Sequence, residues 1–330
     1  MSAPQPVTVA KLVDLVENAK SIGDEAAEKD IGHLELTERL SSLELARLTE
    51  ELSGAKSRSA LIAVGDASVF LEPPGSEKLD KPVPDAAEQR QIMVRASDYL
   101  NNIIPKLPDF YAKRITTAFK IAWVPKDKLG IHKPGPLNLV GKFEATVLYR
   151  NGKEVVHAEG AAQQGLSLNI VGTFGPILAK VMNDNLQSPM LWHGWEKGPN
   201  GALAVFEFHV SMQNSHYSVS LPMAGLGVRR VGYNGEICID PETGTILRLV
   251  IRSDPALAPH AFEHADIMLE YGPVSIGGKS YICPIRGVSI SRASYQESGI
   301  VRRDRAFILL NDVVFTDYHV FRSDIRILPN

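Results

Sequence analysis

The chain has 330 residues, of which 44% are hydrophobic and 22% charged, and its formal net charge is -3. These values are ordinary for a globular protein and leave room for one large domain or two smaller ones. A protein that neutralises nucleic-acid phosphates shows a basic face, whereas no Lys/Arg cluster here is longer than the pair Arg302 and Arg303. The composition therefore argues against nucleic acid as a partner.

The sequence contains no sign of a transmembrane segment. No apolar run approaches the roughly 20 residues that a membrane-spanning helix needs. The first residues, Met1–Pro6, lack the basic region and the apolar core of a signal peptide. We therefore expect either a cytoplasmic protein or a periplasmic or secreted protein whose signal peptide has been removed.

The first part of the chain, residues 1–72, is predicted to be a small helical module. Apolar residues recur at helical spacing after Thr8, again after Ser41, and again from Ser57 to Leu71. Ser41 and Glu44 have the spacing of a capping box. Residues 73–84, rich in proline and charge, then form a predicted linker.

The remaining residues, 85–330, are predicted to form a helix followed by a large antiparallel sheet with a second, inserted helix. Asp85 and Glu88 suit the start of the first helix, and Pro176 suits the first turn of the inserted one. Period-two alternation predicts strands near residues 114–123, 142–149, 154–160, 191–197, 203–212, 217–221, 232–240, 245–252, 266–271 and 279–287, with two more between 307 and 328. The predicted fold class is therefore α+β.

The clearest local signal is a β-hairpin over Gly235–Ile251. Two alternating apolar runs flank Asp240–Gly244, in which Pro241 presets a turn dihedral and Gly244 permits a positive φ. In a simple meander the only two cysteines, Cys238 and Cys283, lie three strands apart, or about 14 Å. This distance exceeds the reach of a disulfide, so we expect two buried free thiols.

Four aromatic residues are the candidate ligand-binding residues: Trp192, Trp195, Phe206 and Phe208. They fall on neighbouring predicted strands just after the inserted helix. On an open sheet face they would bind an apolar ligand. The alternative is ordinary core packing, and the sequence leaves both readings open.

Polar residues give weaker chemical signals. Glu207 and His209 alternate with the aromatic residues, so they should lie on the opposite, solvated face, and a chemical role would need a partner such as His216. Asp317 and His319 likewise should share a solvated face.

One short motif, His260-Ala-Phe-Glu-His264, matches the H-x-x-E-H pattern of inverted zinc proteases. Nearby prolines and a strand that begins by Asp266 leave little room for the helix that this pattern requires. Solvated loop histidines are the favoured interpretation. The chain contains no G-x-S-x-G, P-loop or complete G-x-G-x-x-G motif, so we expect no catalytic residues, no cofactor and no metal.

Seven segments have a distinctive sequence: Leu36–Ser41, Phe206–Val210, Ser215–Tyr217, Gly235–Arg248, Glu270–Pro284, Leu310–Phe315 and Tyr318–Arg322. With these segments, most of the chain resembles a family of uncharacterised bacterial proteins. That family has no established activity to carry over.

More distantly, the Asp-Pro-x-Thr-Gly turn between strands at Asp240–Gly244 is similar to that of lipoprotein localisation factors and sigma-factor-regulator sensor proteins. This resemblance implies a strongly curved, half-barrel-like antiparallel sheet wrapped partly around helices. It also implies an apolar concave face that takes acyl chains, and a location in the bacterial envelope.

Three functional hypotheses follow. The first is a non-enzymatic envelope protein that binds an acyl or lipid-like ligand, or a lipidated partner, on the concave face of its sheet. The alternative is a protein-interaction or scaffold module that docks a partner through the N-terminal helices; deleting residues 1–84 should then leave the sheet folded. The third is a metal-dependent hydrolase that uses His260 and His264.

Overall fold

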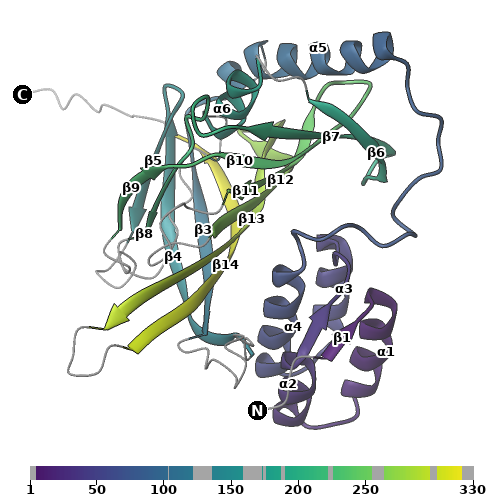
Figure 1. Cartoon of the computed structure of the whole chain (residues 1–330), viewed down its shortest axis with the longest axis vertical. Coiled ribbons are helices and arrows are strands. Elements are labelled where there is room, and N and C mark those ends of the chain that lie inside the picture. The colour runs from purple at the N-terminus through teal and green to yellow at the C-terminus, as the bar shows by residue number, and fades with distance from the viewer. Residues whose placement is uncertain are drawn as a thin grey trace, which may run out of the picture.

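A computed structural model describes residues 5–102, 104–121, 136–158, 173, 176–186, 190–221, 226–254, 264–297 and 303–321. It confirms the α+β class and the large antiparallel sheet, which has ten strands. An N-terminal module lies at one end of the molecule and is joined by a long connecting segment to a helix at the other end (Figure 1).

The N-terminal module packs four helices around its own apolar core. Its two short strands pair in parallel. Thr8 caps the first helix by accepting a hydrogen bond from the Lys11 backbone. Ser41, the N-cap of the third helix, makes no side-chain capping bond, and Glu44 binds Arg47, so the predicted capping box does not form. The elements are β1 (Gln5–Val7), α1 (Val9–Ala19), α2 (Asp24–Gly32), β2 (Leu34–Leu36), α3 (Ser42–Glu51) and α4 (Ala55–Ala67).

The main sheet is antiparallel throughout, in the order β5-β4-β3-β14-β13-β12-β11-β10-β7-β6. A separate pair, β8 and β9, follows β7. The elements are α5 (Ala86–Asn102), η1 (Ile104–Lys106), β3 (Phe110–Ile121), β4 (Asn138–Arg150), β5 (Lys153–Ala158), α6 (Pro176–Asp184), β6 (Leu191–Lys197), β7 (Ala202–Val210), β8 (Ser218–Leu221), β9 (Leu226–Arg230), β10 (Tyr233–Ile239), β11 (Ile246–Ser253), β12 (His264–Ile276), β13 (Lys279–Glu297) and β14 (Arg303–Val320).

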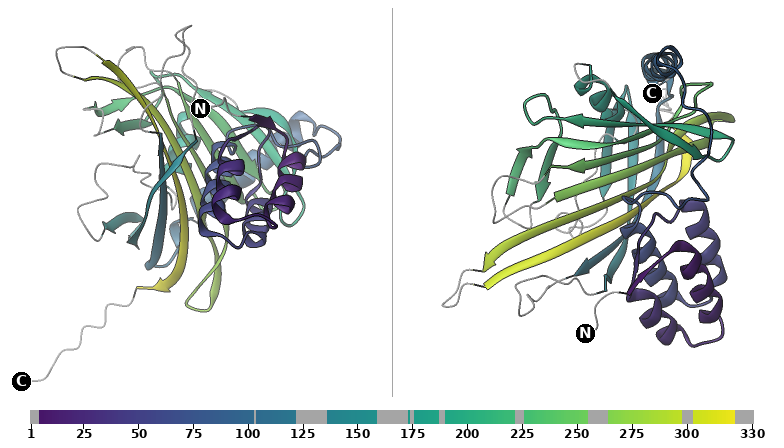
Figure 2. Two further views of the ribbon diagram at one scale, coloured as in Figure 1. Left: turned by 90° about the horizontal axis from the view of Figure 1, so that it is seen from below. Right: turned by 45° about the vertical axis from the view of Figure 1, so that its right-hand side comes forward.

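Three expectations about this sheet need correction. Two strands were expected between 307 and 328, and the structure has one long strand, β14, up to Val320; residues 322–328 lie outside the described residues. β13 continues to Glu297, well past the predicted end at Gly287, so that β13 and β14 project beyond their neighbours (Figure 2). The sheet is open, since its described edge strands β5 and β6 do not pair with each other, and it is uncurled where strong curvature was expected.

The predicted hairpin is confirmed as β10 and β11, with Gly235 opposite Ile251. Asp240 organises the turn: its carboxylate accepts from the backbone of Glu242 and Thr243. Gly244 has a φ of 74°, and a Cβ atom there would lie 2.3 Å from the Arg95 backbone of α5. The turn therefore packs directly against α5.

The two faces of the sheet are covered by different parts of the chain. Successive residues of a strand point to opposite faces. On β11, Leu249 and Ile251 pack in the core beneath α5 and α6, whereas Val250 packs against Val69, just after α4. Asp85 caps α5 as predicted. The sheet is thus enclosed between its own helices on one side and the N-terminal module on the other.

The two cysteines lie on β10 and β13, and both are buried free thiols, as expected. Burial raises the pKa of each thiol to about 12. The thiolate, which is the nucleophilic form, is therefore suppressed in both residues. They act as small apolar residues of the core.

The connector, defined as residues 73–84, is fixed to the outer edge of β6. The Leu79 amide donates to the Trp195 carbonyl at 2.9 Å, and the Lys197 amide donates to the Glu77 carbonyl at 2.8 Å. The Trp195 indole in turn donates to the Pro82 carbonyl at 2.9 Å. The predicted linker is therefore a docked segment that covers part of a sheet edge.

Candidate functional site

The N-terminal module is docked on the sheet through a buried charge cluster centred on Glu196. This carboxylate accepts hydrogen bonds from Arg39 of the module at 2.7 Å and from Arg248 of β11 at 2.8 Å. Burial opposes the charge on Glu196, yet the two guanidinium groups outweigh that cost and hold the pKa of its carboxyl below its usual range. Nearby, Arg252 binds Glu236 at 2.6 Å and the Phe70 carbonyl at 2.9 Å.

A second buried cluster is centred on Arg286 of β13. Its guanidinium donates to Asp312 of β14 at 3.2 Å and also to Asp66 of α4 and Ser42 of α3. The Asp66 side chain is fully buried, and its second carboxylate oxygen has no hydrogen-bond partner. Two carboxylates thus share one guanidinium where the module meets the sheet.

This imbalance makes docking sensitive to protonation. Burial, and then the charge on Asp312, raise the pKa of Asp66 well above its usual range, although Arg286 opposes the shift. Burial likewise raises the pKa of Asp312, again against Arg286, and Glu270 adds a smaller repulsion. A buried carboxyl with a raised pKa stabilises the fold below its unfolded pKa, and this stability is lost as pH rises through the folded pKa.

We therefore expect Asp66→Asn to become more stable than the unmodified protein as pH rises. The asparagine keeps an oxygen for Arg286 but releases no proton. The difference in unfolding free energy should grow between pH 4 and pH 8, by at most about 1.4 kcal/mol per pH unit. Urea unfolding of both proteins measures it, with Asp30→Asn on the exposed surface of α2 as the control. A difference that stays constant with pH would contradict the assignment.

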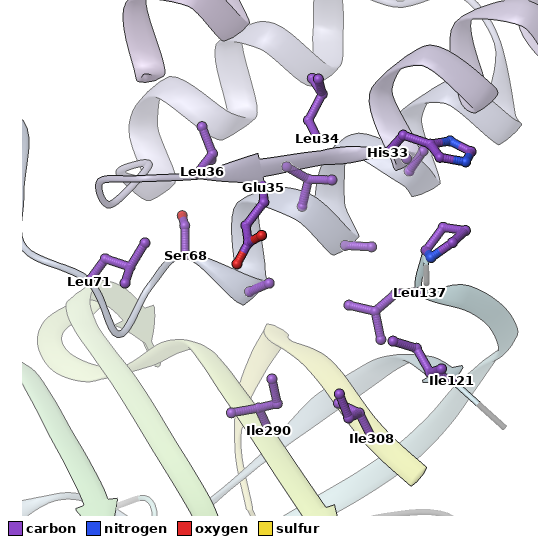
Figure 3. Close-up of a pocket in the computed structure, with 16 residues that line it drawn as sticks. His33, Leu34, Glu35, Leu36, Ser68, Leu71, Ile121, Leu137, Ile290 and Ile308 are labelled. Atoms are coloured by element: carbon purple, nitrogen blue, oxygen red, sulfur yellow. The ribbon is translucent and has the colours of Figure 1, made fainter. Parts of the chain in front are cut away.

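Next to the Arg286 cluster, a cavity of about 270 Å³ separates the module from the sheet. α4 and β2 form one wall, and β3, β13 and β14 form the other (Figure 3). Its lining is mostly apolar: Gly32, His33, Leu34, Glu35, Leu36, Ala60, Ala63, Val64, Ala67, Ser68, Leu71, Ile121, Pro136, Leu137, Ile290 and Ile308.

The polar groups of this cavity are few. Glu35 points into it from β2, while Leu34 and Leu36 point the other way, into the core of the module (Figure 3). The Ser68 hydroxyl is already satisfied, because it donates to the Gly65 carbonyl and accepts from the Leu40 amide. The Nδ1 atom of His33 is hydrogen-bonded to the Lys29 carbonyl.

The four aromatic candidates lie together in the core beneath α5 and α6. The Trp192 ring packs edge-on against Trp195 and Phe206, with centroids 4.9 and 5.4 Å away, and Phe208 packs against Tyr233 at 5.9 Å. Trp195 is also covered by the connector, whose Lys81 ammonium lies 4.5 Å from its ring. The face that they form is therefore filled by the chain's own helices and connector.

Glu207 and His209 lie on the opposite, exposed face of β7, as the alternation predicts. Neither residue contacts His216, the partner suggested from the sequence. Glu207 contacts His193 at 2.8 Å, and His209 lies 3.8 Å from Asp254. Asp317 and His319 flank a β-bulge and line a shallow, open hollow together with Tyr111. Glu207, His209, Asp317 and His319 are all exposed, so they lie on solvated surface.

His260 and Glu263 of the zinc-like motif lie outside the described residues. His264 is described and sits on β12, 3.2 Å from Asp266. Within the described part of the chain, no group of three or more His, Cys, Asp or Glu side chains could hold a metal ion.

A polar cluster that the sequence did not indicate surrounds Asp184, at the end of α6. This buried carboxylate accepts from the His216 ring at 2.6 Å, from the His216 amide at 2.8 Å, and from the Tyr233 hydroxyl at 2.8 Å. The cluster ties α6 to the loop after β7 and to β10. Its members lie 32 and 49 residues apart in the chain, so no local pattern relates them.

No family model, curated protein or solved structure matches this chain. No helix in the described ranges is long and apolar enough to cross a membrane. The candidate site is the cavity between module and sheet, with the charge clusters beside it.

Proposed function

We propose that this chain is a non-enzymatic binding protein that holds a small apolar or acyl-like ligand in the cavity between its N-terminal module and its sheet. The observation that carries this proposal is the cavity itself, which is bounded by two separately packed parts of the chain and lined mainly by apolar side chains. Ligand sites are commonly concave, apolar and located where two such parts meet.

The size of the cavity limits the ligand. One water needs roughly 10–15 Å³ of such space, so a cavity of about 270 Å³ has room for a chain on the order of eight carbons. Each buried methylene contributes about 0.8 kcal/mol, and eight contribute about 6 kcal/mol before the entropy cost of binding is subtracted. This is sufficient for weak but measurable binding.

The cavity replaces the aromatic residues of β6 and β7 as the proposed site, because Phe206 and Phe208 are buried beneath α5 and α6. The lipid-like chemistry of the ligand is retained from the sequence-based hypothesis. A location in the bacterial envelope, and a lipidated protein as the source of the chain, belong to the same proposal. Cell fractionation tests the location separately from binding.

The binding test uses octan-1-ol, an uncharged eight-carbon chain, and isothermal titration calorimetry. Ala67 lines the cavity although its own side chain is exposed, so Ala67→Trp should fill the space and reduce binding at least tenfold. Ala55, an exposed alanine at the other end of α4, does not line the cavity, and Ala55→Trp is the matched control. Native mass spectrometry of protein purified from bacterial cells should also show a co-purified apolar molecule. The absence of saturable binding together with a clean apo mass would remove the proposal.

The alternative hypothesis, docking of a partner through the N-terminal helices, is less favoured. Arg39, Ser42 and Asp66 of the module already bind the sheet. The apolar sides of α1 to α4 are used in the module's own core. Capture of a partner by the intact chain, lost on substitution of exposed module residues, would support it.

A further inference from the structure

The charge that lines the cavity points to the class of head group that the ligand carries. Among the described residues that form its walls, Glu35 is the acid, and none of these residues is Lys or Arg. Glu35 is the middle residue of β2, and strand alternation directs it away from Leu34 and Leu36, which are buried in the module core. Its carboxylate therefore faces the space between module and sheet (Figure 3).

The Glu35 carboxylate is available to a ligand. Glu35 is exposed, and its side chain makes no hydrogen bond or ion pair within the described part of the chain. The neighbouring Ser68 hydroxyl is already used by Gly65 and Leu40. An ionised carboxylate only accepts hydrogen bonds, so the ligand group that binds Glu35 must be a hydrogen-bond donor.

We propose that the ligand is a single-chain amphiphile with a primary amine as its head group, which binds Glu35 while its apolar chain fills the cavity. This inference rests on the proposed function. A protonated amine supplies up to three donors and a charge opposite to that of Glu35. A fatty acid of the same length would place a second carboxylate beside Glu35, and like charges that are brought together repel.

The test compares octylamine, octan-1-ol and octanoate on the full-length protein by calorimetry at pH 7.5 and low salt, below their micelle-forming concentrations. Octylamine should bind at least tenfold more tightly than octanoate, with octan-1-ol between them. Glu35→Gln should bring amine and carboxylate within about threefold of each other and leave the alcohol unchanged. Glu28→Gln, on the exposed surface of α2 and outside the cavity lining, should change none of the three.

The outcomes separate the two proposals. If all three ligands bind equally, and Ala67→Trp weakens all of them, the cavity binds chains but the head-group assignment is wrong. A preference for octanoate, or an amine preference that survives Glu35→Gln, also overturns it. If none of the three binds, the proposed function fails as well. Because Glu35 makes no contact that the fold needs, Glu35→Gln should unfold at the same temperature as the unmodified protein, which circular dichroism checks.

Discussion

Replacing Arg286 by methionine should lower the free energy of unfolding by about 3–5 kcal/mol, the usual cost of removing one partner from a buried ion pair. The loss is large because Asp66 and Asp312 would remain buried with no cation between them. The module and the sheet would both be affected, since Arg286 joins α4 to β13 and β14. Urea unfolding at pH 7 measures the change.

Two further variants show whether unpaired charge is the cause. Adding Asp66→Asn and Asp312→Asn to Arg286→Met removes the stranded carboxylates and should recover at least half of the lost stability. Arg47, which pairs with Glu44 and Glu51 on the surface of α3, serves as the control. Arg47→Met should cost less than about 1 kcal/mol, as exposed ion pairs do. Equal losses for the Arg47 and Arg286 variants would contradict the importance of burial.

Deleting residues 1–84 should abolish the soluble, folded sheet domain. The deletion uncovers Val250, Met268 and Val288, which are now packed against Val69. Burial of each such side chain contributes about 1.5–3 kcal/mol. The deletion also removes Asp66, which binds Arg286, and Arg39, which binds Glu196. The alternative hypothesis of a scaffold module expects the opposite result, a sheet that stays folded after this deletion.

The sharper form of this experiment cuts the chain without removing the module. Gly75 and Ser76 are exposed, and a Cβ atom on Gly75 would meet nothing within 4 Å. A protease site inserted between them should be tolerated. After cleavage, the two fragments should co-elute on size exclusion with unchanged far-ultraviolet circular dichroism. A stable, monomeric 85–330 fragment, or separation of the cut fragments, would show that docking is not needed for folding.

The parts of the fold that the sequence predicted are those with local causes. The hairpin of Asp240–Gly244, the cap at Asp85 and the helix after Pro176 each depend on residues within one turn of each other. The strand β13 was predicted too short, although the alternation continues past Gly287 through Val288, Ser289, Ile290 and Ser291. The parallel pair β1 and β2, three residues each, is shorter than any periodic signal.

The candidate site could not be predicted, because it depends on residues that are far apart in the sequence. Alternation correctly separated Phe206 and Phe208 from Glu207 and His209, but it carries no information about which distant segment covers each face. Asp66 and Arg286 are 220 residues apart, and Arg39 and Glu196 are 157 apart. Glu35 looked like any charged residue between two leucines. Only the tertiary arrangement places it over Ile290 and Ile308 in one cavity.

The docking of the connector along β6 has a consequence for self-association. An uncovered sheet edge can add strands from other copies, and two uncovered edges allow such growth to continue without end. Glu77 and Leu79 occupy part of the β6 edge, whereas among the described strands β5 pairs only with β4. Edge-to-edge pairing through β5 alone is two-fold and closes at two molecules. The segment that tethers the module therefore also covers part of one of the two described edges from which such growth could proceed.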